Sequence, residues 1–290
     1  MMPDVTDATP EPRPMTRALT RALARAAASA SPTGPVGSPV PEMPLQPLAT
    51  VAVVALAGLL TITTYAGPVL VALAVGLAAG VMAWGWSGLL GLPSPRGTAF
   101  VLAVGSAAAI GTVLATVDDP FLAWVPAALA GSMIVAFLHQ LARKDGRPRL
   151  VESVASNVTA IAIVVSGASF VALSRTQHGG LVVAIASAAV AVSALTDLAG
   201  ASQRLLAWLL PLAMLAGGLA AVGVGILLGA VSWGAAALLG VLAAGVSHAV
   251  RRVLAMLPAI SSARSQLVSA SASVLTGGVV VYVVGRLLIT

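Results

Sequence analysis

Residues 205–228 read LLAWLLPLAMLAGGLAAVGVGILL, a continuous apolar stretch without a single charged side chain. A run of about twenty such residues is the length of an α-helix that crosses a hydrocarbon core about 30 Å thick. Leu, Ala, Gly and Val dominate the stretch, and the small residues among them allow helices to approach one another closely in lipid. The stretch therefore predicts a transmembrane helix.

The composition of the whole chain extends this reading. Of its 290 residues, 59% are hydrophobic and only 8% are charged, whereas soluble domains carry about 25% charged residues. A transmembrane β-barrel is excluded, because barrel strands alternate polar and apolar residues over about ten positions. The chain has no Cys, which excludes disulfides, thiolate metal sites and a Cys nucleophile.

The fold class that follows is all-α, a polytopic integral membrane helix bundle of about nine transmembrane helices. A Pro-rich, basic stretch at 1–47 is predicted to be a disordered cytoplasmic tail, and 48–290 is predicted to be the transmembrane domain. The nine expected spans are residues 48–66, 68–86, 98–117, 121–142, 150–173, 180–199, 205–228, 232–250 and 266–287.

The distribution of basic residues predicts the orientation. If the N-terminal tail lies in the cytoplasm, every one of the 15 Lys and Arg residues except Arg175 and Arg286 falls on the cytoplasmic side. Cytoplasmic loops of membrane proteins carry such an excess. We therefore expect a cytoplasmic N-terminus, an outside C-terminus and a position in the cell membrane. The net charge of +6 is explained by this bias, so we expect no nucleic-acid partner.

Four ionisable side chains lie at helix ends that share the predicted cytoplasmic side. They are His139, Glu152, Asp197 and His248. Ionisable groups in membrane helices are costly and so are candidates for function. The outer half of the bundle, by contrast, is expected to be almost featureless.

Each candidate also has a purely structural interpretation. Glu152 has the i,i+3 spacing for an ion pair with Arg149, and Asp197 can pair with Arg204 across a short turn. The two histidines can hydrogen-bond to water or lipid headgroups at the interface. A metal site needs three or four converging ligands, and these residues are too few to predict one, so Asp197 is a weak candidate only.

Three local motifs carry a resemblance to a known family. They are Trp84-Gly85-Trp86, the stretch Ser193-Ala194-Leu195-Thr196-Asp197-Leu198-Ala199-Gly200, and Leu257-Pro258 followed by Arg264 and Ser269. With the order and spacing of the helices over about 48–290, they resemble bacterial phosphatidate cytidylyltransferases, also called CDP-diacylglycerol synthases, and especially the actinobacterial members. The resemblance implies a polar site reached from the cytoplasm, where a divalent metal helps to join CTP to phosphatidic acid.

The chain departs from that family where the chemistry is concentrated. It has no acidic residue after Asp197, and residues 258–265 read PAISSARS in place of the family's terminal signature. Phosphoryl transfer needs carboxylates that hold metal ions and cations that neutralise phosphates. The resemblance therefore implies a degenerate relative, with Asp197, Arg264 and His248 as the weak catalytic candidates.

Three functions remain open from the sequence. The first is a non-catalytic scaffold or partner of lipid or envelope enzymes, in contact with the bilayer, with anionic phospholipid headgroups at the cytoplasmic face and with a membrane-protein partner. The second is a transporter or permease, for which Asn157 and Gly217-Gly218 are hints. The third is an active lipid enzyme. No cofactor is expected, and magnesium only if the third interpretation holds.

Overall fold

The computed structural model describes residues 46–144, 146, 148–201, 203–229 and 232–289, with the backbone alone at 200, 201, 203 and 204. The predicted tail at 1–47 lies almost wholly outside this part of the chain. Within the described ranges the fold is all-helical, with nine helices long and apolar enough to cross a membrane. They are α2 (Pro47–Ala66), α3 (Pro68–Leu89), α4 (Pro95–Ala115), α5 (Val125–Ala142), α6 (Leu150–Ser174), α7 (Gly179–Thr196), α8 (Leu209–Leu228), α9 (Trp233–Ala255) and α10 (Ala263–Leu288).

The helix ends follow the turn chemistry of the sequence. Proline occupies the first or second position of α2, α3, α4 and α5, where its missing N–H costs nothing. Gly67 joins α2 to α3 with φ +121°, a conformation that L side chains rarely adopt. The prediction of nine membrane helices is confirmed for the described residues.

Three short 3-10 helices complete the chain. The elements η1 (Asp197–Ala201) and η2 (Gln203–Trp208) connect α7 to α8, and η3 (Pro258–Ser261) connects α9 to α10. The prediction that helical spans cover 180–199 and 205–228 is therefore correct in position, but α7 already ends at Thr196. Asp197 consequently stands at the end of α7 and at the beginning of η1.

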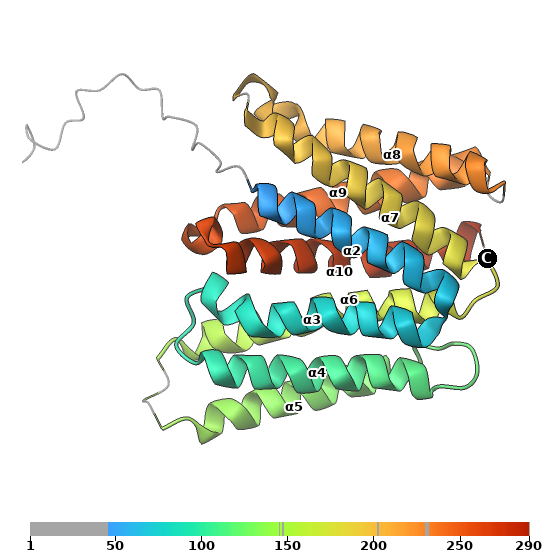
Figure 1. The fold of residues 1–290 in the computed structure, drawn as a ribbon. Coiled ribbons are helices and arrows are strands. Elements are labelled where there is room, and N and C mark those ends of the chain that lie inside the picture. Colours follow the sequence, from blue (N-terminus) through green and yellow to red (C-terminus); the bar gives the residue numbers. More distant parts are fainter. Residues whose placement is uncertain (1–45, 145, 147, 202, 230–231, 290) are drawn as a thin grey trace, which may run out of the picture. The chain divides into compact units, whose positions relative to one another are not determined.

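The last helix, α10, is the most enclosed. It contacts α2, α3, α6, α7 and α9, and 67% of its most apolar 18-residue window is buried inside the protein. Figure 1 shows α2 and α10 between α7, α8 and α9 on one side and α3, α4, α5 and α6 on the other. For α5 and α8 the buried share is 28%, so these two helices have the largest faces left for lipid.

Helices α6 and α10 approach one another closely. The hydroxyl of Ser166 donates to Thr276 O at 2.8 Å and accepts from the Val279 N–H at 3.0 Å. A Cβ placed on Gly278 would lie 2.0 Å from Ser166 O, so only glycine fits there. Small residues thus bring the two backbones together, as in other membrane bundles.

The predicted orientation gives an accessibility experiment, made simple by the absence of Cys. A single cysteine at Val117, in the α4–α5 connection, is expected to react with a membrane-impermeant maleimide added to intact cells. A cysteine at Lys144, in the α5–α6 connection, is expected to react only after the membrane is opened. The reverse pattern would contradict the tail-inside orientation that the basic residues predict.

Candidate functional site

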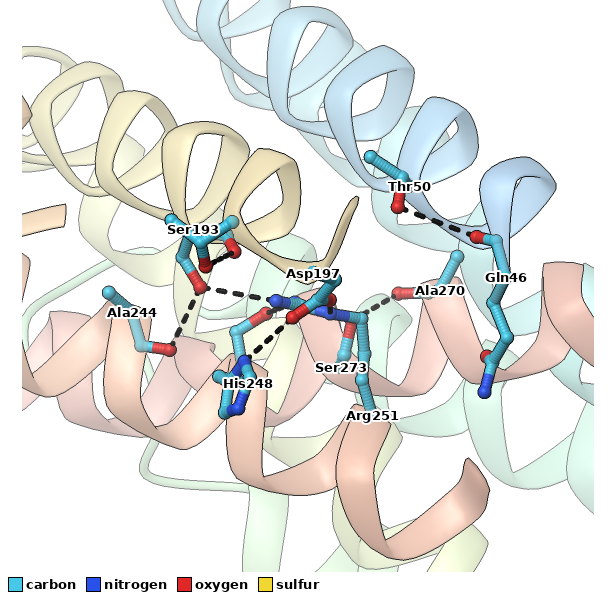
Figure 2. Close-up of polar contacts among 11 residues, drawn as sticks. Gln46, Thr50, Ser193, Asp197, Ala244, His248, Arg251, Ala270 and Ser273 are labelled. Atoms are coloured by element: carbon cyan, nitrogen blue, oxygen red, sulfur yellow. Dashed lines mark hydrogen bonds and ion pairs between the residues drawn. The ribbon is translucent and has the colours of Figure 1, made fainter. Parts of the chain in front are cut away.

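Asp197 is the centre of a polar cluster formed by the ends of α7 and α9. Its Oδ2 lies 2.6 Å from Nε of Arg251, and its Oδ1 lies 2.8 Å from Nδ1 of His248. Figure 2 shows the carboxylate between the two α9 side chains. The side chain of Asp197 is 24% exposed, whereas those of His248 and Arg251 are 1% and 4% exposed.

Arg251 hydrogen-bonds through all three of its nitrogens, and two of these bonds join α9 to the end of α7. Besides the contact of Nε with Asp197, one terminal nitrogen donates to the Ser247 hydroxyl at 2.7 Å and the other to the Ser193 hydroxyl at 3.1 Å. Ser193 in turn donates to Ala244 O at 3.2 Å. A buried charge is tolerated only when it is paired and hydrogen-bonded in this way.

His248 completes the cluster, although neither of its ring nitrogens forms an aligned hydrogen bond within the described residues. The separation of its Nδ1 from Asp197 Oδ1 is that of an ion pair, but neither atom has an aligned hydrogen-bond partner. Its Nε2 is buried and has no hydrogen-bond partner among the described residues. The expectation that His248 lies at the interface with water or headgroups is wrong, because the helices enclose it.

The charged side chains of the cluster compensate one another. The negative charge of Asp197 is balanced by Arg251, so the cluster is neutral when His248 is neutral and carries one positive charge when it is protonated. Opposite charges attract strongly in a medium of low dielectric constant, and separating them leaves each one uncompensated. The cluster therefore holds the C-terminal ends of α7 and α9 together.

The donor set does not fit the magnesium ion that the family resemblance implies. Magnesium is bound through carboxylates, waters and substrate phosphates in octahedral geometry. Both oxygens of Asp197 already contact cationic or imidazole nitrogens, so a metal ion there would have to displace Arg251 or His248. No group of three or more His, Cys, Asp or Glu side chains suited to a metal ion occurs within the described residues.

Arg264, the remaining weak catalytic candidate, belongs to a different contact. Its guanidinium lies 4.2 Å above the ring of Trp84 and donates to Trp84 O. A Cβ on Gly85 would lie 3.2 Å from the Arg264 side chain, and Trp86 Nε1 donates to Ser156 at 2.9 Å. The Trp-Gly-Trp motif thus joins α3 to α10 and to α6.

The other two candidates have structural partners. Glu152 pairs with Arg149 as the i,i+3 spacing predicted. His139 Nε2 lies 3.2 Å from Ser94 Oγ, and its ring lies where a Cβ on Gly97 would be, 1.9 Å away. His139 therefore packs α5 against the beginning of α4.

The expectation of a featureless outer half is wrong. Arg286 near the end of α10 pairs with Asp119 at 2.6 Å. Arg175 at the end of α6 donates to Val113 O and Thr116 O and lies 4.0 Å from the Phe121 ring centroid. Both arginines thus fasten the α4–α5 connection to neighbouring helices.

Sequence reasoning missed Arg251 as a member of the site. It placed this residue among the basic residues that set orientation, and it considered Arg204 as the partner of Asp197. The side chain of Arg204 is not among those described. The signal that was available is the spacing on α9, since Arg251 follows Ser247 by four residues and His248 by three, which is about one helical turn.

Comparison with known proteins adds no relative: no family model, no curated protein and no solved structure matches the chain.

Proposed function

We propose that this multi-pass membrane protein is a non-catalytic component of the cell membrane, acting as a scaffold or partner for enzymes of lipids or the envelope. One observation carries the proposal. The residue that the family resemblance would make the metal ligand, Asp197, has its carboxylate oxygens within ion-pair distance of Arg251 and His248.

The resemblance to phosphatidate cytidylyltransferases supplies the rest of the proposal. A relative can keep the helix arrangement while its central carboxylate forms an internal ion pair. Such a relative would have the same helix bundle but no cytidylyl transfer activity. Metal-dependent phosphoryl transfer draws several kcal/mol of transition-state stabilisation from its ions. Arg264 does not make up for the loss of the metal site, because its guanidinium lies over the Trp84 ring and donates to Trp84 O.

An activity assay tests the non-catalytic half of the proposal. Purified full-length protein in lipid nanodiscs, given CTP, magnesium and phosphatidic acid, is expected to form no CDP-diacylglycerol above the level of empty nanodiscs. Mass spectrometry of the extracted lipids is the measurement. Turnover that is lost in Asp197→Asn but kept in the surface control Asp119→Asn would overturn the proposal in favour of an active lipid enzyme.

Proximity labelling in the native cell tests the partner half. A labelling enzyme fused at the cytoplasmic side is expected to enrich enzymes of phospholipid or envelope synthesis over a control fusion to an unrelated multi-pass protein. An equal set of labelled proteins from both fusions would contradict the partner role.

A further inference from the structure

A pocket of about 430 Å³ opens at the end of the bundle opposite to Asp197, around the α4–α5 connection. It is lined by Thr112, Ala115, Thr116, Val117, Asp118 and Trp124. Helix α4 ends at Ala115 and α5 begins at Val125, so the pocket lies where two candidate membrane-spanning helices end and begin.

Three of the side chains that line the pocket, those of Thr112, Thr116 and Asp118, present acceptors, while the indole N–H of Trp124 is a donor. The Thr112 hydroxyl donates to Ala109 O at 3.0 Å, and the Thr116 hydroxyl donates to Thr112 O at 2.7 Å. Each hydroxyl has one proton and two lone pairs, so both protons are used within α4. The third polar side chain, the Asp118 carboxylate, is acceptor-only when ionised. The lining therefore suits a ligand that brings its own N–H or O–H donors.

Charge at this end of the bundle distinguishes Asp118 from its neighbour. Asp119 is paired with Arg286, whereas the exposed Asp118 has no ion-pair partner within the described residues. Arg175, a cation at the same end of the bundle, donates to the backbone carbonyls of Val113, Thr116 and Val117, lies over Phe121, and does not itself line the pocket. Asp118 is thus the one carboxylate among the lining residues, and no described cation forms an ion pair with it.

Trp124 adds the second feature of a cation site. Its side chain is 64% exposed and forms part of the pocket wall. The face of an indole ring attracts cations, and structures that recognise organic ammonium groups combine aromatic rings with nearby negative charge. A Trp at a membrane interface is common in itself. Here it shares a pocket with an unpaired carboxylate and two acceptor hydroxyls.

We propose that the pocket at Asp118 and Trp124 binds an organic primary ammonium group at the membrane–water interface on the outer side of the cell membrane. The ammonium donates to the Asp118 carboxylate and to the hydroxyl oxygens of Thr112 and Thr116, and its charge lies against Trp124. The same chemistry occurs in the ethanolamine headgroup of a phospholipid and in a free amine dissolved in water, so the experiment has one arm for each source.

The free-amine arm uses ethanolamine and full-length protein in nanodiscs of phosphatidylglycerol, with binding followed by saturation-transfer NMR. Asp118→Asn is expected to weaken ethanolamine binding about fivefold, the upper range for an exposed charge pair. Trp124→Leu is expected to weaken it about two- to fivefold, as for an exposed cation–π contact. Tetramethylammonium, which has no N–H donor, is expected to bind more weakly than ethanolamine.

Two matched variants serve as controls. Asp119→Asn removes the same charge one residue away, and Trp233→Leu removes an exposed indole at the beginning of α9, with 76% exposure. Both are expected to change ethanolamine binding less than about twofold, which is smaller than the loss of one exposed charge pair or cation–π contact. Thermal unfolding of each variant shows whether the fold is kept.

The lipid arm replaces the nanodisc lipid with equal parts of phosphatidylethanolamine and phosphatidylglycerol, and mass spectrometry quantifies the lipid that stays bound after mild detergent extraction. Retention of phosphatidylethanolamine that falls in Asp118→Asn but not in Asp119→Asn identifies the headgroup as the ligand, and binding in the free-amine arm alone identifies a soluble amine. Either result supports the site. An equal response of the two Asp variants in both arms, or no binding in either, overturns it.

Discussion

Replacing Asp197 with Asn is expected to lower the free energy of unfolding by about 3–5 kcal/mol, the cost of breaking a buried ion pair by removing one partner. The amide is almost the same size as the carboxylate, so the loss comes from charge. Arg251 would remain 4% exposed and uncompensated, still bonded to Ser193 and Ser247 but without its counterion. Thermal unfolding of the detergent-solubilised protein, followed by circular dichroism, measures the effect.

Two further variants separate charge pairing from a general sensitivity of the fold. Asp119→Asn breaks a pair that is much more exposed and is expected to cost about 0–1 kcal/mol. In Asp197→Leu combined with Arg251→Met both charges are gone, and most of the stability is expected to return, because apolar replacements of buried pairs are often neutral or better. Equal losses in Asp197→Asn and Asp119→Asn would show that the cluster does not stabilise the bundle.

The second large effect is expected at Gly278. Its Cβ position lies 2.0 Å from Ser166 O and 3.2 Å from the Cα of Gly167, so Gly278→Ala forces the backbones of α6 and α10 apart. Overpacking of this kind costs about 1–3 kcal/mol or more, and here the clash is with backbone that no side-chain rotation relieves. A lower melting temperature of the solubilised protein is the expected result.

The adjacent glycine supplies the control. A Cβ on Gly277 would meet nothing within 4 Å, and alanine is favoured over glycine in a helix by about 1 kcal/mol. Gly277→Ala is therefore expected to leave the melting temperature unchanged or to raise it. If both variants lowered it equally, the close approach of α6 and α10 would not be the cause.

Hydropathy alone predicted the existence and positions of the helices well, because a membrane requires long apolar spans and proline and glycine mark their ends. The third span was predicted at 98–117 and is Pro95–Ala115, and the eighth was predicted to end at 250 although α9 continues to Ala255. Both errors involve polar residues. A helix can continue beyond its apolar stretch and include polar residues such as Arg96 and Arg252, where the hydropathy is low.

The candidate site was only half predictable. Asp197 and His248 were singled out because ionisable residues in membrane helices are costly, and the structure brings these two together. Arg251 was missed because a basic residue near a cytoplasmic loop is usually explained by orientation. Arg264 was grouped with the wrong partners, since its position over Trp84 depends on how α3 packs against α10, which no local pattern specifies.

The central place of α10 has a consequence for how the protein is made. Among the described helices it is the last to leave the ribosome, yet it is the helix against which α2, α3, α6, α7 and α9 all rest. Membrane helices insert first and associate afterwards, so the five helices that contact α10 enter the bilayer before their common neighbour. During that interval the hydroxyl of Ser166 and the small-residue face beside it meet lipid or an insertion factor, and assembly of the bundle is completed only when α10 enters.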